Sequence, residues 1–435
     1  MPRGADDRRV GRVLVLGGGG REHAVVRALL RSPQHPEVVC APGTAGIARD
    51  HVPCLALDPT DVTAVVAAAR EHRCDLVVVG PEAPLVAGVV DALTAAGILA
   101  FGPSAAAARL EGSKAYAKEV MAAAGVPTAG YALARTREEA ESHLEAAGYP
   151  LVLKADALAA GKGVVICATE EEARSALDVF FLEQRFGATE VVIEEFLEGE
   201  ELSLLALCDG ERAVPLAPAR DYKRIFDGDA GANTGGMGAF SPVPGFDPEH
   251  AEVLARCAHQ PVVDEMRRRG TPYHGVLYAG LMLTADGPRV LEYNARFGDP
   301  EAQAVLPRLR SDLAELLERC TRPGGLAGVE IEWSLDWAVT VVLASGGYPE
   351  TSSTGDRISG LRSIGAIETE VLHAGTAERD GRFVTAGGRV LNVTGFGPSP
   401  GEARERAYDA ADRIAFEGKQ MRRDIAAEAA DRVGV

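Results

Sequence analysis

Short β-branched runs alternate with helical patterns over roughly the first hundred residues, and this alternation limits the chain to few architectures. Strands that alternate with helices of about 10 residues favour a parallel sheet covered on both faces. The strand-like runs are 12–16, 38–41, 76–79 and 98–101. The clearest helical segments are 61–71 and 85–96. We therefore expect an N-terminal α/β domain over residues 11–103, preceded by a flexible tail at 1–10.

The rest of the chain divides into two further parts. Residues 104–325 begin with a helical stretch (104–125), continue through a small α+β unit at about 128–195, and then predict two hairpins around a helix over 248–269. Within the small unit, Thr136 followed by Glu139 predicts a helix that runs to Ala147. The segment 217–247 shows no regular pattern, which is typical of a functional or disordered loop. Residues 326–435 predict a β-rich domain, with strands over 337–344 and 389–396, that ends in an amphipathic helix over 400–416.

The composition limits the classes of function that this chain can have. The 435 residues carry 45 basic and 63 acidic side chains, a net charge of −18, and no basic block, so nucleic acid is disfavoured as a partner. No apolar run reaches the roughly 18 residues that span a bilayer. The seven cysteines form no CxxC pair, which argues against a zinc site and for reduced thiols. We expect a cytoplasmic, soluble protein that acts on small molecules.

A run of four glycines, Gly17–Gly20, lies between the first strand and the first helix. Glycines there let the backbone approach an anion at a helix N-terminus, although a tight turn without a ligand is the plain alternative. A nicotinamide site would need glycine at position 22, which is Glu22, and an acid at the end of the second strand, which reads Cys40-Ala41-Pro42. A second unusual loop, 80–84, follows another strand, and carboxyl-end loops of one sheet converge on one crevice.

Two later segments suggest phosphate and metal chemistry. Lys154 ends a strand and is followed by a small-residue loop that carries Gly161, Lys162 and Gly163 before another strand, which suits a lid over a polyphosphate or a mobile surface hairpin. In the segment 292–297, Glu292, Asn294 and Arg296 share one strand face. Two oxygen ligands without His or Cys suit Mg²⁺, although a polar outer strand face gives the same pattern. The acidic run 194–201 is either a solvated hinge or a purine-binding edge.

In order along the chain, these segments resemble the ATP-grasp ligases, and among them the phosphoribosylamine–glycine ligase family. The resemblance covers nearly everything after residue 10. Its motifs are GGGGREHA (17–24), APGTAG (41–46), VGPEAPLV (79–86), FGPS (101–104), LEGSKAYAK (110–118), KADALAAGKGV (154–164), IEEFLEGEE (193–201), NTGGMGAFSP (233–242), GVLYAGLM (275–282), EYNARFGDPE (292–301), GGYP (346–349), HAGT (373–376), GGRVLNV (387–393) and RRDI (422–425).

The resemblance implies an α/β protein with an N-terminal Rossmann-like parallel sheet domain, a central ATP-grasp domain with a small α+β lid, and a C-terminal β-rich domain. It implies that ATP drives the ligation of glycine to 5-phosphoribosylamine through glycyl phosphate, a step of purine biosynthesis. The enzyme would need Mg²⁺ or Mn²⁺ and would work as a monomer or weak homodimer, without nucleic acid or membrane partners. Two alternatives stay open: another ATP-grasp carboxylate–amine ligase of purine metabolism, and a nucleotide-binding regulator without turnover.

The resemblance also assigns residues to roles. The expected catalytic residues are Arg296, Asp299 and Lys154. The expected ATP-binding residues are Lys114, Lys154, Gly161, Lys162, Gly163, Glu194, Glu195, Phe196, Leu197 and Glu201. The expected substrate-binding residues are Gly18, Gly19, Glu22, Pro81, Glu82, Asp221, Lys223, Asn233, Gly235, Gly236 and Met237. Glu292 and Asn294 would hold the metal. Two departures from the family pattern are Ala157, where the lid loop usually has glycine, and the acid-free strand 280–284.

Overall fold

The computed structural model describes residues 9–157, 163–187, 190–365 and 367–433. Its N-terminal domain is a four-stranded parallel sheet in the order β2-β1-β3-β4, as the alternating pattern predicts. The residues of β3 are all buried because helices cover both faces of the sheet. The strands are β1 (Arg12–Gly17), β2 (Glu37–Pro42), β3 (Leu76–Val79) and β4 (Leu99–Phe101). The helices are α1 (Gly20–Leu30), α2 (Ala45–Arg49), α3 (Val62–Glu71), α4 (Glu82–Val86) and α5 (Val89–Ala95).

Three predicted helices are each divided in two. The segment 85–96 breaks at Gly88, whose φ of 85° is left-handed, so α4 and α5 are separate. The segment 104–125 breaks at Ser113, which is extended and whose hydroxyl accepts a hydrogen bond from the Tyr116 N–H at the start of the next helix. The third break is at His259. The resulting helices are α6 (Ala105–Gly112), α7 (Lys114–Ala124), α10 (Pro248–Ala258) and α11 (Gln260–Arg268).

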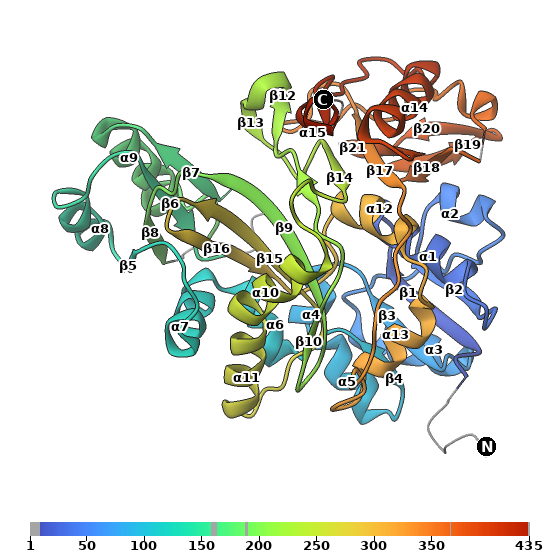
Figure 1. The fold of residues 1–435 in the computed structure, drawn as a ribbon, viewed down its shortest axis with the longest axis horizontal. Coiled ribbons are helices and arrows are strands. Elements are labelled where there is room, and N and C mark those ends of the chain that lie inside the picture. The colour runs from blue at the N-terminus through green and yellow to red at the C-terminus, as the bar shows by residue number, and fades with distance from the viewer. Residues whose placement is uncertain (1–8, 158–162, 188–189, 366, 434–435) are drawn as a thin grey trace.

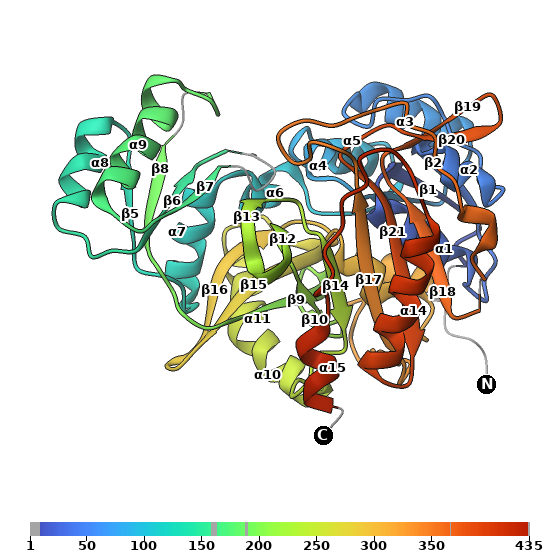
Figure 2. The same ribbon diagram turned by 90° about the horizontal axis from the view of Figure 1, so that it is seen from above.

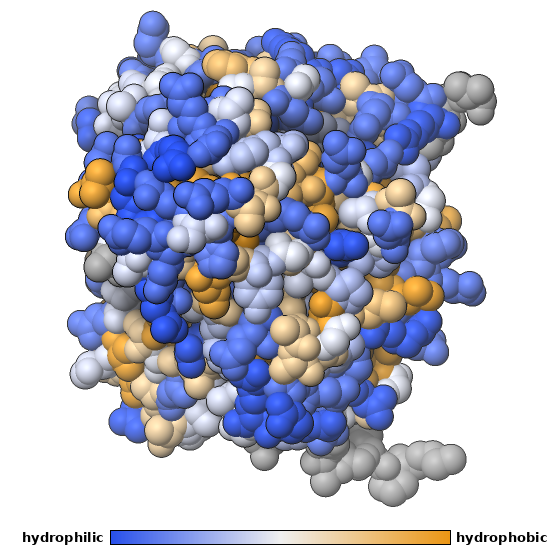
Figure 3. Space-filling view, turned by 90° about the vertical axis from the view of Figure 1, so that its left-hand side faces the viewer, coloured by the Kyte–Doolittle hydropathy of each residue, from blue (hydrophilic) through white to orange (hydrophobic). Residues whose placement is uncertain are grey.

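The lid unit, defined here as residues 131–195, stands apart from the other domains (Figures 1 and 2). Its antiparallel sheet has the order β5-β8-β6-β7, and its buried residues form a hydrophobic cluster of their own. Thr136 caps α8 as predicted, but this helix ends at Leu144 rather than Ala147. The elements are β5 (Tyr131–Ala134), α8 (Arg137–Leu144), β6 (Leu151–Ala155), β7 (Val164–Cys167), α9 (Glu170–Leu177), a π-helical turn (Asp178–Leu182) and β8 (Val191–Glu195). The face of the molecule on this side is mostly hydrophilic (Figure 3).

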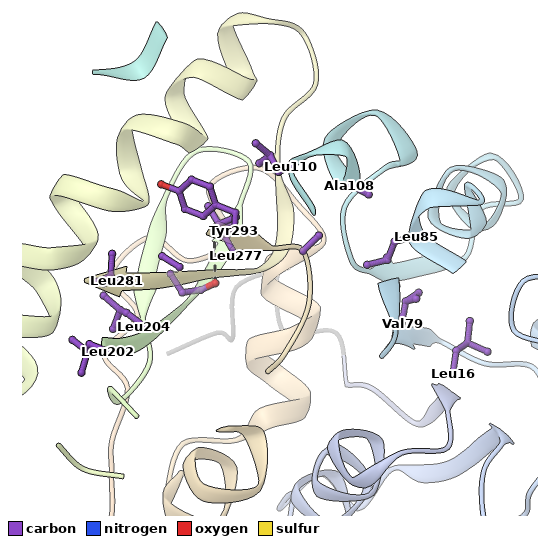
Figure 4. Packing of buried hydrophobic residues seen from close by; sticks show 14 of the residues in the cluster. Leu16, Val79, Leu85, Ala108, Leu110, Leu202, Leu204, Leu277, Leu281 and Tyr293 are labelled. Carbon is purple, nitrogen blue, oxygen red and sulfur yellow. Dashed lines mark hydrogen bonds between the residues drawn. The ribbon is translucent and has the colours of Figure 1, made fainter. Parts of the chain in front are cut away.

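The central sheet is antiparallel, in the order β10-β9-β15-β16, and both predicted hairpins are present in it. Leu202, Leu204, Leu277 and Tyr293 belong to the large hydrophobic cluster that also contains residues of the N-terminal domain (Figure 4). The strands are β9 (Glu200–Asp209), β10 (Ala213–Pro215), β15 (His274–Thr284) and β16 (Gly287–Asn294). They are followed by α12 (Glu301–Val305), a 3-10 turn (Leu306–Arg308) and α13 (Leu313–Cys320).

The segment 217–247 is not irregular, contrary to the sequence-based expectation. It contains four strands of two to four residues, too short to show a periodic pattern. Two of them join the sheet of the C-terminal domain, because β11 pairs with β14, and β14 pairs with β17 about 100 residues later in the chain. The strands are β11 (Arg220–Asp221), β12 (Arg224–Phe226), β13 (Ala230–Asn233) and β14 (Gly238–Ser241), with a 3-10 turn (Asp227–Asp229) after β12.

The C-terminal domain is the β-rich unit that the sequence predicts. Its sheet has the order β11-β14-β17-β21-β18, and α14 packs on β21. Helix α14 ends at Arg413, before the predicted end at residue 416. The remaining elements are β17 (Trp337–Ala344), a 3-10 turn (Leu361–Ser363), β18 (Thr369–His373), β19 (Thr376–Arg379), β20 (Arg382–Thr385), β21 (Arg389–Gly397), α14 (Pro400–Arg413) and α15 (Ala427–Val433). Among the described helices, none is both long and apolar enough to cross a membrane.

Candidate active site

A cavity of about 250 Å³ lies where the N-terminal domain, the lid unit, the central sheet and the C-terminal domain meet. Its walls are dominated by charged side chains, which is unusual for a buried space and typical of a site that binds charged ligands. Its charged residues are Arg21, Glu82, Glu111, Lys114, Lys118, Lys154, Glu194, Asp221, Lys223, Glu292, Arg296, Asp299, Glu301 and Arg389.

Lys154, Lys114 and Gly163 line this cavity, as expected for residues that contact polyphosphate. Lys154 ends β6 with its ammonium 2.9 Å from Glu194 Oε2 and 3.0 Å from the carbonyl oxygen of Leu291. Lys114 begins α7 and donates to the carbonyl oxygens of Ala155 and Ala157, at 3.0 and 2.9 Å. The two cations are therefore fixed on the strand and helix that flank the lid loop. Gly161 and Lys162, also expected here, lie outside the described residues.

The Glu194 carboxylate lies between two lysines. Its Oε1 lies 3.1 Å from the ammonium of Lys118, and both side chains are almost fully buried. Burial lowers the pKa of Lys118 to about 8, with Glu194 opposing the shift. Sequence reasoning missed Lys118, although it lies four residues after Lys114 on the same helix face.

Glu292 and Asn294, at the end of β16, both face the cavity. The side chain of Glu292 makes no hydrogen bond or ion pair with any described residue, and among these residues Asn294 Oδ1 accepts a hydrogen bond only from Arg296 Nη2, at 3.2 Å. Burial alone would raise the pKa of Glu292, but Lys223, Lys154 and Lys114 outweigh it and hold the pKa below its ordinary value. An ionised carboxylate without a partner, beside an amide oxygen, fits the oxygen ligands that Mg²⁺ or Mn²⁺ prefers.

Arg296 lies just after the end of β16, and hydrogen-bond acceptors surround its guanidinium. Its Nη2 is 2.8 Å from Glu111 Oε1, and its Nε is 3.3 Å from Glu82 Oε2. Burial would lower the pKa of Arg296, but Glu111 and Glu82 outweigh it and raise that pKa. The guanidinium is thus held ionised at the border between the N-terminal domain and the central sheet.

Asp299 is held by the C-terminal domain. Arg389 Nη2 lies 3.1 Å from Asp299 Oδ2, and Arg389 Nη1 donates to the Asp299 carbonyl oxygen at 2.7 Å and to the carbonyl oxygen of Gly235. Gln303 Nε2 donates to Asp299 Oδ1 at 2.7 Å. Burial would raise the pKa of Asp299, but Arg389 and Arg21 lower it. Arg389 is a site residue that sequence reasoning missed, although it belongs to the quoted motif 387–393.

Asp221 and Lys223, two residues apart in the chain, line the cavity on the side of the central sheet. Ser203 Oγ lies within hydrogen-bond distance of Asp221 Oδ1 (3.2 Å) and of the Tyr278 hydroxyl (2.9 Å). Burial raises the pKa of Asp221 to about 7, Lys223 opposes this shift, and Glu301 adds to it. Lys223 Nζ lies 2.8 Å from Glu201 Oε2. Carboxyl groups outnumber cations in this corner, which makes it suitable for an ammonium group.

A second cavity of about 650 Å³ shares Lys154, Glu194, Lys223 and Glu292 with the first. Its remaining walls come from the segment that joins β8 to β9, from apolar side chains of the two flanking sheets, and from mostly polar and charged residues of the segments 220–233 and 422–428, Asn233 among them. A space of this size suits a nucleoside. Its residues include Val152, Ile166, Glu195, Phe196, Leu197, Glu201, Met282 and Leu291. The acidic run thus lies along a pocket, while Glu195, Glu198 and Glu200 are also exposed to solvent.

The two N-terminal loops that carry expected substrate-binding residues lie at the end of the site away from the second cavity. Glu82 lines the first cavity, whereas Gly18, Gly19, Glu22 and Pro81 are not part of its wall. The Glu22 carboxylate turns back under its own loop and accepts a hydrogen bond from the Gly19 N–H at 2.6 Å. Burial raises the pKa of Glu22.

The glycines of this loop are required by close packing. A side chain at Gly17 or Gly80 would collide with Glu22, at 2.5 and 2.3 Å. Gly19 lies near Asp299, since a β-carbon there would be 3.6 Å from its Oδ2. The glycine loop therefore adjoins the site next to Asp299.

The four residues of the segment 233–237 that are expected to bind substrate lie in different places. Asn233 lines the second cavity and Gly235 the first. Gly236 is close to Pro300, and a β-carbon there would meet that ring at 2.3 Å. Met237 is fully buried in a small hydrophobic cluster with Ile225 and Val342. It lies in the hydrophobic core rather than at a cavity.

Comparisons with known proteins agree with this architecture. Three models of phosphoribosylglycinamide synthetase match the chain: the N domain at residues 11–111, the ATP-grasp domain at 112–302 and the C domain at 338–428. The phosphoribosylamine–glycine ligase of Streptomyces coelicolor is 53% identical over 423 residues, which are 96% of this chain and 99% of that protein.

Two solved structures support the fold. The crystal structure of phosphoribosylamine–glycine ligase from Thermotoga maritima is 36% identical, has a TM-score of 0.81, and is matched over 95% of this chain and 100% of that chain. The biotin carboxylase domain of a 2-oxoglutarate carboxylase from Hydrogenobacter thermophilus, solved with MgADP and bicarbonate, shares the fold at 20% identity and a TM-score of 0.71, over 95% of this chain and 92% of that chain. The fold class expected from the sequence is confirmed, and the chain belongs to the phosphoribosylglycinamide synthetase family of ATP-grasp ligases.

Proposed function

We propose that this chain joins glycine to 5-phosphoribosylamine and forms glycinamide ribonucleotide, ADP and phosphate. The observation that carries the proposal is the meeting of two fixed lysines, an unpartnered ionised carboxylate and a buried arginine around one cavity. That set suits transfer of a phosphoryl group to a carboxylate, because such a transfer depends mainly on positioning and charge neutralisation. Membership of the family supports the choice of substrates.

The adenine and ribose of ATP fit the larger cavity. The backbone of Glu195 and Leu197 would bind the adenine edge and Glu201 the ribose hydroxyls, since all three residues line this cavity. The triphosphate then extends past the shared wall towards Lys154 and Lys114. Glu292 and Asn294 would hold Mg²⁺ or Mn²⁺, which supplies positive charge to the phosphate oxygens when bound.

Glycine fits the acidic corner. The ammonium group of glycine supplies a positive charge beside Asp221 and Glu301. The carboxylate of glycine is then free to face the terminal phosphate. A carboxylate oxygen attacks the γ-phosphorus, the bond to the β-phosphate oxygen breaks, and ADP leaves. The product is glycyl phosphate, in which phosphate is a good leaving group.

The amine of phosphoribosylamine approaches from the N-terminal domain, past Glu82 and the glycine loop. It attacks the carbonyl carbon of glycyl phosphate beside Arg296 and Asp299. Arg296 stabilises charge on the acyl phosphate, and the ionised Asp299 can accept the proton that the amine loses. The carbon–oxygen bond breaks, and phosphate leaves with that oxygen.

A substrate-omission assay tests the function. We expect phosphate release only when ATP, glycine and phosphoribosylamine are all present, with glycinamide ribonucleotide formed in equal amount. Release with formate or bicarbonate in place of glycine would assign the chain to another carboxylate–amine ligase. ATP binding without any phosphate release would make it a regulator and reject the proposal.

A further inference from the structure

Glu111 is not among the residues to which the sequence assigns a role. Glu111 lies in the last turn of α6, at the boundary between the N-terminal domain and the ATP-grasp domain. Only 8% of its side chain is exposed, although it is a carboxylate. A buried carboxylate is costly unless its charge and its lone pairs are satisfied, so its partners decide why it is there.

Both oxygens of Glu111 bind the segment that carries Arg296. Oε1 lies 2.8 Å from Arg296 Nη2, and Oε2 accepts a hydrogen bond from the backbone N–H of Ala295 at 2.7 Å. One rigid carboxylate therefore fixes the main chain just before Arg296 and the guanidinium itself. Two such contacts set the orientation of the side chain as well as its charge.

The remaining contacts of Arg296 are weaker. Its Nε lies 3.3 Å from Glu82, and its Nη1 donates to the Phe297 carbonyl oxygen at 3.3 Å. Its Nη2 also donates to Asn294 Oδ1 at 3.2 Å. Among the described residues, Glu111 therefore makes the shortest contact with this guanidinium.

We propose that Glu111 is a positioning residue that aims the Arg296 guanidinium at the acyl phosphate. The inference rests on the proposed function, because it assigns Glu111 to the same reaction. It also gives α6 a role beyond linking two domains, since the helix joins the amine-binding side of the site to the group that stabilises the leaving phosphate.

A double-mutant cycle tests the assignment. Glu111→Gln keeps the shape and the acceptor for Ala295 but removes the charge that holds Arg296. We expect kcat to fall about 10-fold or more while KM for ATP changes less than about 2-fold. Because Glu111 acts through Arg296, the same change in an Arg296→Lys background should lower kcat by no more than about 2-fold. The matched control is Glu119→Gln, which breaks an acid–arginine pair with Arg269 outside the cavity and should leave kcat unchanged.

Two outcomes overturn the inference: wild-type kcat in Glu111→Gln, or independent effects that multiply in the double variant. If Glu111→Gln does not fold, Glu111→Asp decides, since it keeps the charge but is too short to reach both partners. A readout without turnover is the crystal structure of the variant, in which Arg296 should leave its position; an unmoved guanidinium contradicts the inference. Failure of the wild-type enzyme to form glycinamide ribonucleotide would instead reject the proposed function.

Discussion

At the scale of single residues, the site keeps opposite charges close together and away from water. Lys118, Glu194 and Lys154 form one buried chain of charges. Glu111, Arg296 and Glu82 form another, which is partly exposed at Arg296 and Glu82. Removing one member of such a chain leaves the others unpaired, so single substitutions here have effects beyond the group that is lost. Glu292 differs, because its carboxylate faces the cavity without a described partner.

This difference leads to a prediction for Glu292. Glu292→Gln removes a charge that no described side chain pairs with, so the fold should be retained while the metal–nucleotide complex loses the negative charge of one oxygen ligand. We expect kcat to fall at least about 100-fold, with the melting temperature within a few degrees of wild type. Steady-state kinetics and calorimetry check both values. Near-normal kcat would contradict the role, and the exposed Glu198→Gln serves as control.

Lys154 gives a second residue-scale prediction. Lys154→Met keeps the length of the side chain but removes its charge, so charge on the transferred phosphoryl group is less well neutralised. We expect kcat to fall by roughly 100-fold in the phosphate-release assay. The variant also leaves Glu194 with Lys118 alone, so some loss of stability should accompany the kinetic effect. An unchanged dependence of rate on ATP concentration, together with unchanged kcat, would count against this position for the triphosphate.

At the scale of elements, the sequence predicts most strands of the parallel sheet and both hairpins, because buried β-branched runs and turn residues are local signals. It misses the divisions of three helices, since a break at a single residue does not disturb an apolar pattern. It also misses β11 and β14, because both are very short and β14 pairs with β17, far along the chain. In the site, motif residues such as Glu292 and Arg296 are found, whereas Glu111 and Lys118 depend on how helices α6 and α7 pack.

The break between α10 and α11 supports a prediction about acid stability. His259 is fully buried there, with Nε2 3.1 Å from the Leu204 carbonyl oxygen, and burial lowers its pKa to about 4. The unfolded chain takes up the proton near pH 6.5, so the folded state is favoured fully above that pH. This contribution is lost as the pH falls from about 6.5 to about 4, and it amounts to roughly 3 kcal/mol.

His259→Gln should therefore flatten the dependence of the unfolding free energy on pH between 4.5 and 7. Denaturant unfolding at both pH values gives the comparison. His250→Gln, an exposed histidine on the neighbouring helix, should keep the slope of the wild type. Equal slopes for wild type and His259→Gln would show that the buried imidazole does not resist protonation.

At the scale of the whole molecule, the active site exists only because several domains meet. The N-terminal domain, central sheet and C-terminal domain share one large hydrophobic cluster, while the lid unit has its own. This division suits a rigid body with one part that closes over the nucleotide. The C-terminal domain contributes Arg389, which joins Asp299 to the segment around Gly235.

Arg389→Ala tests that contribution across domains. Without the guanidinium, Asp299 keeps only Gln303 among its described close partners, and its position next to the glycine loop is less defined. We expect kcat to fall about 10-fold to 100-fold and KM for phosphoribosylamine to rise more than KM for ATP. The control is Arg382→Ala, an exposed arginine of the same domain. Equal increases in both KM values would contradict a role on the amine side.

The path of one oxygen atom tests the central claim most directly. Glycine labelled with ¹⁸O in its carboxylate is converted with ATP and phosphoribosylamine, and the phosphate is examined by ³¹P nuclear magnetic resonance. Attack of the carboxylate on the γ-phosphorus places one glycine oxygen in each phosphate, so we expect singly labelled phosphate in equal amount to the product. Unlabelled phosphate would show that the carboxylate is never phosphorylated and would contradict the account.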